Sequence, residues 1–127
     1  MTAVETLYRD GGYCVIVLEN EAAVRAVDPD LRALAAGGDR QAIVTAPGDS
    51  TDVVSRMFAP GAGVDEDPVT GSAHAVIVPY WANRLGRQRF TAFQASKRGG
   101  HLDCALDGDK VILSGRCVTV IEGTFLL

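Results

Sequence analysis

The sequence has few cysteine and histidine residues, and their spacing argues against a paired-cysteine motif and a metal site. Cys14, Cys104 and Cys117 are odd in number and show no C-x-x-C spacing, and each lies in an apolar segment where a thiol behaves as a small hydrophobic side chain. We therefore expect buried, inert thiols in a reducing cytoplasm, with a catalytic thiol as the less favoured alternative. His74 and His101 are far apart and have no companions at metal-ligand spacing, so no metal ion is expected.

The sequence also lacks the features that direct a chain to a membrane or to nucleic acid. The first residues are polar, with no basic segment and no long apolar run, so neither secretion nor membrane insertion is indicated. The formal charge is −4 and no stretch combines basic with aromatic residues, which argues against nucleic-acid binding. With 127 residues, 47% of them hydrophobic, and no internal repeat or linker, we predict a single cytoplasmic domain over residues 1–127.

Seven segments have the composition of short strands, and two short helices lie among the first of them. The strand candidates are residues 13–18, 41–46, 52–58, 88–96, 101–106, 110–114 and 117–125. Apolar and polar residues alternate in 101–106, and Asp107-Gly108 supplies a tight hairpin turn to the next strand. Alternation within 52–58 places its odd-numbered and even-numbered side chains on opposite faces. Residues 21–27 and 30–36 are the helix candidates, and Asp30 is expected to cap the second.

Residues 72–85 form the longest apolar segment, and this segment is apolar nearly all round. Its apolar residues are Ala73, Ala75, Val76, Ile77, Val78, Tyr80, Trp81, Ala82 and Leu85. A helix without a polar face belongs in the interior of a domain, and Gly86 marks its expected end. Strands that have one apolar face could wrap around this helix, and this arrangement would bury both the helix and the apolar face of the strands. The pattern therefore predicts an α+β fold in which about seven strands surround one central helix.

The loop that leads into this helix is rich in glycine and proline and carries three carboxylates at residues 65–67. It ends in Thr70, Gly71 and Ser72, which offer two hydroxyls and a bare glycine amide at the helix N-terminus. Such an end can hold an anion, for example a substrate carboxylate. Ordinary capping of the helix uses the same residues, and the two uses are compatible.

Asp67 is the strongest candidate for acid–base chemistry. It lies shortly before the helix, beside Glu66 and directly before Pro68, which favours an extended backbone. The helix end favours the ionised carboxylate, whereas Glu66 and burial favour the protonated one, so this group could accept a proton near neutral pH. The alternative is a structural Asp-Pro turn. In the basic cluster that follows the helix, Arg98 is expected at the rim of the cleft and the other basic residues on a solvated face.

Four stretches form a set of motifs: residues 56–60 (RMFAP), 63–74 (GVDEDPVTGSAH), 94–100 (QASKRGG) and 111–116 (VILSGR). Together they resemble the second-half signature of the phenazine-biosynthesis isomerase (PhzF-like) family, and the resemblance spans most of the chain from about residue 13. It implies a diaminopimelate-epimerase-like fold, in which a strongly bent, barrel-like antiparallel sheet rolls around a central helix. It also implies similarity to cofactor-independent isomerases and epimerases, which move a proton between carbon positions on a small carboxylated substrate.

The resemblance further implies roles for single residues. Asp67 corresponds to the aspartate that assists proton transfer or orients the substrate amine. The residues expected to bind substrate are Thr70, Gly71, Ser72, Glu66 and Arg98. Proteins of this family carry two similar halves with the active site between them, and their acid/base glutamate and a glycine–histidine loop belong to the first half, which this sequence does not contain. His74 belongs to the second-half motif and is not the histidine of that loop.

Two functions therefore remain in view. In the first, the chain is an isomerase-type domain for a small carboxylate-bearing substrate, and a first-half domain or a second copy in a homodimer completes its cleft. In the second, it is a non-catalytic domain that keeps an anion-binding or interaction surface, or a fragment of a longer two-domain isomerase. Neither function is expected to need a cofactor.

Overall fold

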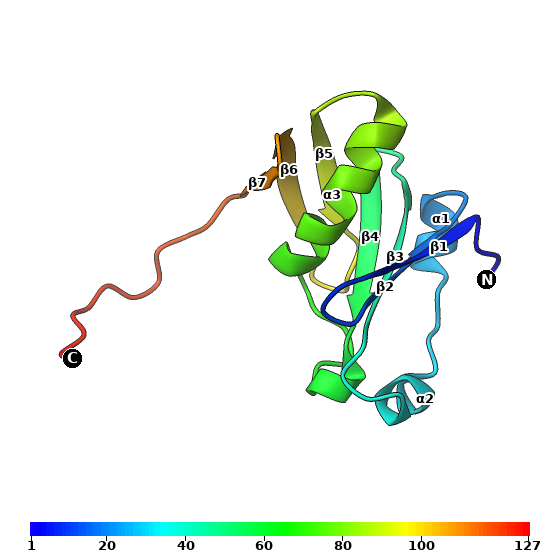
Figure 1. The fold of residues 1–127 in the computed structure, drawn as a ribbon. Coiled ribbons are helices and arrows are strands. Elements are labelled where there is room, and N and C mark those ends of the chain that lie inside the picture. Colours follow the sequence, from blue (N-terminus) through cyan, green and yellow to red (C-terminus); the bar gives the residue numbers. More distant parts are fainter.

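The computed structural model describes residues 1–127 and contains one curled sheet of seven strands, which neighbour one another in sequence order (Figure 1). The strands are β1 (Glu5–Arg9), β2 (Tyr13–Val17), β3 (Gln41–Pro47), β4 (Val53–Phe58), β5 (Arg89–Gln94), β6 (Gly100–Asp107) and β7 (Lys110–Ser114). The sheet curls into a half-barrel that stays open, because the edge strands β1 and β7 do not pair with each other. The α+β class predicted from the sequence is confirmed.

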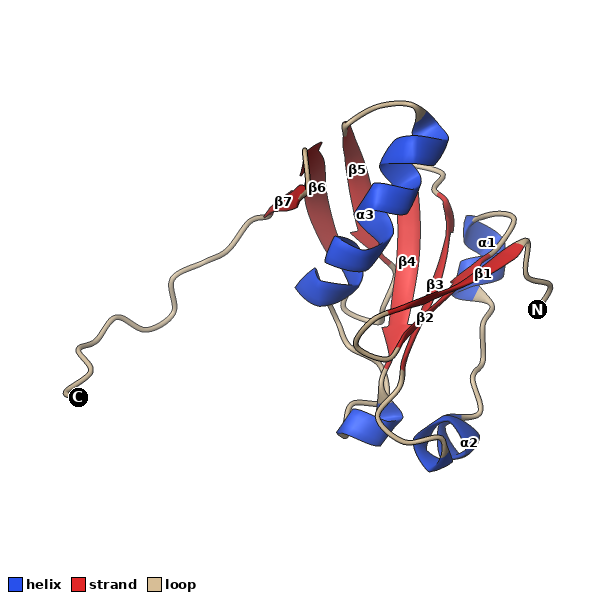
Figure 2. Ribbon diagram, viewed as in Figure 1, coloured by secondary structure: helices blue, strands red, loops and turns tan.

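Helices cover both faces of the sheet (Figure 2). The helical segments are α1 (Glu21–Arg25), α2 (Leu31–Ala36), the 3-10 turn η1 (Pro60–Ala62) and α3 (Gly71–Leu85). The helix α3 lies across the concave face, whereas α1 and α2 pack on the other face. Asp30 caps α2 as predicted, because its carboxylate accepts a hydrogen bond of 2.9 Å from the amide of Ala33.

The central strand β4 has apolar side chains on both faces and therefore separates two hydrophobic cores. Val53 and Met57 pack with Trp81 of α3 in the larger core. Val54 and Phe58 belong to the smaller core beneath α1 and α2. This is the arrangement that the alternation within residues 52–58 predicts. Because β4 is buried on both faces, it forms a firm support for the loop that follows it.

The strand directions correct one prediction, because the sheet is mixed rather than antiparallel. The strand β2 runs parallel to β3, and β4 runs parallel to β5, while all other neighbours are antiparallel. Parallel neighbours need a crossover connection, and the helices supply both crossovers. The pair α1 and α2 joins β2 to β3 on one face, and α3 joins β4 to β5 on the other.

The strand β1 is absent from the sequence-based prediction. Its segment ETLYR contains a single partly buried residue, Leu7, so its hydrophobic signal is weak. The strand forms because Gly11 and Gly12, with φ angles of 83° and 81°, reverse the chain and align it antiparallel to β2. As an edge strand with one free side it needs little apolar character, which is why pattern reasoning missed it.

Residues 117–125, which were predicted to be a strand, form none. The segment lies extended but has no neighbour that could complete a ladder of backbone hydrogen bonds. Cys117, expected to be buried, is therefore exposed, whereas Cys104 is buried and Cys14 is half-buried. Burial raises the pKa of the Cys104 thiol to about 11, so this thiol stays protonated and unreactive, as expected for an inert cysteine.

The helix α3 ends as predicted at Gly86, which adopts the left-handed conformation with φ of 68°. The prediction that strands surround it on all sides is wrong, because the half-barrel is open. Ala75, Pro79 and Asn83, spaced four residues apart, form a face that points away from the sheet and is exposed. No helix has the length and apolar composition to cross a bilayer, and α3, the longest, has 15 residues.

Candidate functional site

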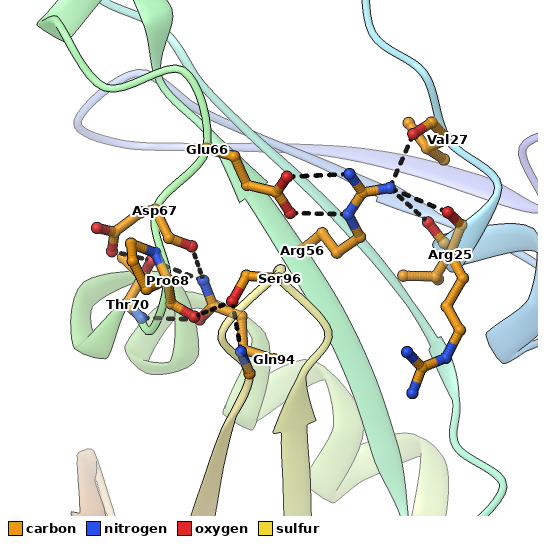
Figure 3. A network of polar contacts seen from close by, with 11 residues as sticks. Arg25, Val27, Arg56, Glu66, Asp67, Pro68, Thr70, Gln94 and Ser96 are labelled. Atoms are coloured by element: carbon orange, nitrogen blue, oxygen red, sulfur yellow. Dashed lines mark hydrogen bonds and ion pairs between the residues drawn. The ribbon is translucent and has the colours of Figure 1, made fainter.

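A buried glutamine fixes the loop between β4 and α3 to the neighbouring strand β5 (Figure 3). The Gln94 side chain is fully buried, and its Oε1 accepts a hydrogen bond of 2.7 Å from the amide of Thr70. Its Nε2 donates to the Asp67 carbonyl at 2.7 Å and to the Thr70 hydroxyl at 3.0 Å. The Gln94 side chain thereby forms hydrogen bonds with both ends of the segment from Asp67 to Thr70, and these bonds hold the segment in a single conformation.

The Asp67 carboxylate lies at the start of α3, half-buried, where the sequence motif predicts it. Its backbone amide donates to the Met57 carbonyl at 3.0 Å, which ties the loop to β4. Its Oδ2 accepts a hydrogen bond from the Thr70 hydroxyl. The expected capping role of that hydroxyl is therefore wrong, because Thr70 occupies the N-cap position but its side chain makes no capping hydrogen bond.

The first amides of α3 are left without a protein acceptor. Gly71 and Ser72 are exposed, and neither backbone amide donates a hydrogen bond within the chain. A Cβ built on Gly71 would have no heavy atom within 4 Å, so the space in front of this helix end is open. Free amides at a helix N-terminus, together with the positive end of the helix dipole, favour a bound anion.

The second predicted carboxylate, Glu66, is already paired. Arg56 of β4 donates to both of its oxygens, from Nε at 2.8 Å and from Nη2 at 3.0 Å (Figure 3). The remaining Nη1 of Arg56 donates to the carbonyls of Val24, Arg25 and Val27 at the end of α1, at 2.7 to 3.2 Å. Arg56 therefore connects the loop before α3 to the helix on the opposite face of the sheet.

The loop between β5 and β6 brings Arg98 to the same side of the molecule. The Ser96 hydroxyl donates to the Pro68 carbonyl at 2.7 Å, which joins this loop to the one that carries Asp67. Arg98 is exposed and lines a cleft of about 970 Å³ together with Gly71, and a smaller one of about 430 Å³ together with Glu66. Of the predicted site residues, Glu66, Gly71 and Arg98 line these clefts, whereas Asp67, Thr70 and Ser72 line neither of the two.

His74, one turn into α3, supports the start of the helix from inside the core. Its side chain is fully buried, and Nδ1 lies 2.7 Å from the Thr70 carbonyl, while Nε2 has no partner. Since a carbonyl only accepts, Nδ1 carries the proton in this contact. Burial lowers the pKa of His74 below its ordinary value of 6.5, and the hydrogen bond to Thr70 opposes that shift only in part.

We expect the stability of the protein to fall as the pH drops below 6.5, because His74 must stay neutral when folded. Below pH 6.5 the unfolded chain binds a proton at His74 that the folded chain does not, so stability is complete above this value and declines below it. Glu21 and Asp52, whose pKa values are held low mainly by hydrogen bonds from backbone amides, contribute only at more acidic pH. Urea unfolding between pH 5.5 and 7.5 should show this slope in the wild type and in His101→Gln. A His74→Gln variant with the same slope would contradict the assignment.

The sequence pattern does not identify Gln94 and Arg56 as supports of the site. Both residues lie inside the quoted motifs, and this position is the one signal that the sequence carries, but their partners lie on other elements. No group of three or more His, Cys, Asp or Glu side chains is gathered closely enough to hold a metal ion.

Comparison with known proteins agrees with this motif set. The family described as phenazine biosynthesis-like protein (PhzC-PhzF) matches residues 6–123. The chain belongs to the PhzF family. An uncharacterized isomerase of Pseudomonas aeruginosa is 53% identical over 113 residues, which are 89% of this chain and 43% of that protein. A PhzF-family crystal structure from Enterococcus faecalis is 43% identical, with a TM-score of 0.83, and the match covers 90% of this chain and 44% of that one.

A second solved PhzC/PhzF protein, from Clostridium difficile, is 34% identical with a TM-score of 0.86, and the match covers all of this chain but 49% of that one. The chain thus spans less than half the length of the PhzF relatives that it matches.

Proposed function

We propose that this chain is an isomerase-type domain that moves a proton on a small carboxylated substrate without a cofactor. Asp67 takes up the proton or orients the substrate amine, the amides of Gly71 and Ser72 hold the substrate carboxylate, and Arg98 adds positive charge at the rim. The observation that carries the proposal is the placement of a carboxylate beside unsatisfied amides at the start of one helix, in a chain whose relatives include proteins named isomerases.

The proposed reaction needs a second contributor, because the acid/base glutamate that the resemblance implies belongs to the first half of the family's proteins, to which nothing in this sequence corresponds. That contributor is a first-half domain or a second copy of this chain. Both oxygens of Glu66 are held by Arg56, so in a pair of identical chains Asp67 is the acidic group left for this role.

The alternative is a domain that binds a carboxylate but does not turn it over. Both functions use the N-terminus of α3, but only the isomerase function needs Asp67. Binding of a carboxylate needs only the amides of Gly71 and Ser72 and the Ser72 hydroxyl, whereas proton transfer needs a group that titrates. Hydrogen exchange from D₂O into a panel of small amino and aromatic carboxylates, followed by NMR, separates them. Binding of a carboxylate without exchange, both alone and with a first-half domain, would support the binding function.

Removal of the Ser72 hydroxyl is expected to weaken ligand binding and to leave folding unchanged. Ser72 is exposed and its hydroxyl makes no hydrogen bond within the chain, so Ser72→Ala should alter the free energy of unfolding by less than about 0.5 kcal/mol. A hydrogen bond to a charged ligand is worth about 1.5–3 kcal/mol, so the dissociation constant of a bound carboxylate should rise roughly 10- to 100-fold. Calorimetric titration with the tightest carboxylate of the panel measures this.

The matched control is Ser50→Ala, which removes an exposed hydroxyl from another wall of the cleft that Gly71 lines. The two alanine variants should be equally stable, and only Ser72→Ala should lose affinity. Equal affinities would place the carboxylate away from the helix end and contradict the proposed binding mode.

A further inference from the structure

Thr70, the residue directly before α3, has all of its polar groups bonded within the chain. Its amide donates to Oε1 of Gln94 at 2.7 Å, and its carbonyl accepts from Nδ1 of His74 at 2.7 Å. Its hydroxyl oxygen accepts from Nε2 of Gln94 at 3.0 Å. Gln94 and His74 are both fully buried. The one hydrogen whose direction these bonds leave open is that of the Thr70 hydroxyl.

The Gln94 amide fixes the direction of the bonds around Thr70, because its two ends cannot be exchanged. Its oxygen faces the backbone N–H of Thr70, and its nitrogen lies 2.7 Å from the carbonyl of Asp67. A reversed amide would place two donors against each other at Thr70 and two acceptors against each other at Asp67, inside the protein. Both N–H groups of Gln94 are therefore used, one by the Asp67 carbonyl and one by the Thr70 hydroxyl.

The hydroxyl hydrogen of Thr70 has a single acceptor, which is Oδ2 of Asp67 (Figure 3). Since Thr70 is only 6% exposed, water does not readily replace this acceptor. The bond keeps Oδ2 as an acceptor and fixes the rotation of the carboxylate. The other oxygen, Oδ1, has no donor within the chain and is open to solvent. The two oxygens of Asp67 therefore have different surroundings, and one of them is already engaged.

We propose that Thr70 is a positioning residue, which holds Oδ2 of Asp67 and thereby presents Oδ1 as the one oxygen that meets the substrate. In the proton exchange, the C–H bond of the substrate breaks, an O–H bond forms at Oδ1, and the electron pair stays on the substrate until a proton returns. This role deepens the proposed function and rests on it. Thr70 then acts through Asp67, whereas the resemblance implies that Thr70 binds the substrate itself.

Thr70→Val tests this role, because valine keeps the shape of threonine and removes the hydroxyl. The measurement is deuterium incorporation from D₂O into the panel of small amino and aromatic carboxylates by the assembled protein. We expect kcat to fall by about 10- to 100-fold, since a displacement of roughly 1 Å at a reacting group costs up to about 10²-fold in rate. KM should stay unchanged, because the amides of Gly71 and Ser72 remain in place. Thr70→Ser, which restores a hydroxyl, should recover the rate.

The combination of Thr70→Val with Asp67→Asn shows whether Thr70 acts through Asp67. If it does, the double variant exchanges at the same rate as Asp67→Asn alone, because the group that Thr70 positions has already lost its function. If Thr70 instead touches the substrate, the two losses multiply and Thr70→Val raises KM. Multiplied losses, or a raised KM with an unchanged kcat, would overturn the positioning role.

Thr45→Val is the matched control for the loss of a buried hydroxyl. The Thr45 hydroxyl of β3 donates to the Val54 carbonyl at 2.8 Å and accepts from Nε1 of Trp81 at 3.0 Å, within the core and away from Asp67. Its removal should lower stability in urea, as Thr70→Val does, and leave the exchange rate unchanged. An equal loss of rate in both variants would show that lower stability is the cause, and the positioning role would be wrong.

Hydrogen exchange with water, followed by NMR on the full chain, tests the bond order without any turnover. In the wild type the Thr70 hydroxyl hydrogen and both side-chain amide hydrogens of Gln94 should exchange slowly. In Thr70→Val one of the two Gln94 hydrogens should exchange fast. A Thr70 hydroxyl hydrogen that exchanges as fast as that of an exposed threonine would overturn the inference.

The two measurements separate the failure of this inference from the failure of the proposed function. If Thr70→Val exchanges substrate hydrogen at the wild-type rate, the positioning role is wrong and the isomerase function stands. If the assembled wild type exchanges no hydrogen of any carboxylate in the panel, the proposed function is wrong. Slow exchange of the Thr70 and Gln94 hydrogens would then show that their bond order serves the fold alone.

Discussion

Asp67→Asn is expected to lower the rate of proton exchange on a small carboxylate by a factor of about 10²–10⁴, the usual contribution of a positioned acid or base. Asparagine keeps the size of the side chain and an oxygen that can accept from the Thr70 hydroxyl, so the loop should retain its conformation. The amide cannot take up a proton, and this is the property that the proposed reaction requires. Stability in urea should therefore stay close to that of the wild type.

The measurement is deuterium incorporation in the assembled protein, whether the second contributor is another copy or a first-half domain. Asp65→Asn is the matched control, because Asp65 is exposed, lies two residues away and makes no hydrogen bond through its side chain. Its exchange rate should equal that of the wild type. If Asp67→Asn instead unfolds at lower urea concentration and exchanges at the normal rate, Asp67 is a structural residue of the Asp-Pro turn.

The location of this candidate site could be predicted because its parts are contiguous in the sequence. A carboxylate at position 67 and a helix start at Thr70 are neighbours in any fold that makes residues 72–85 a helix. The partners of these groups could not be predicted in the same way. Gln94 reaches Thr70 only after α3 has returned the chain to β5, and no local pattern shows this contact.

The difference between local patterns and contacts with distant elements also explains which features of the fold could be predicted. Alternation within β4 predicted which side chains face each core, because alternation depends on the strand alone. The direction of a strand relative to its neighbour depends on the connection between them, so the pattern within a strand could not predict the two parallel pairs. Residues 117–125 show the opposite case, since they have strand composition but no partner within the chain. A strand forms only when two segments pair, so strand composition in one segment does not by itself predict a strand.

Arg56→Met is expected to destabilise the protein by about 3 kcal/mol, the lower end of the range for breaking a buried ion pair by removal of one partner. The Arg56 side chain is 13% exposed and that of Glu66 is 26% exposed. Water can therefore solvate the Glu66 carboxylate only in part once Arg56 has been removed. Methionine keeps the apolar stem but lacks the guanidinium, whose carbon lies 4.9 Å from the centre of the Phe58 ring, and it donates nothing to Glu66 or to the carbonyls at the end of α1. Urea unfolding at pH 7 measures the loss.

Two further variants test the cause of that loss. Arg87→Met removes a guanidinium that is 51% exposed and pairs with Asp52, whose side chain is 28% exposed, and a pair at the surface contributes only about 0–1 kcal/mol. Arg56→Met combined with Glu66→Gln should recover part of the stability, because the second change removes the unpaired charge. If Arg56→Met costs no more than Arg87→Met, the Arg56–Glu66 pair is not a structural support, and Glu66 is free to act on a ligand. If the cost is as large as expected, the carboxylate of Glu66 serves the fold, and the acidic chemistry of this loop depends on Asp67 alone.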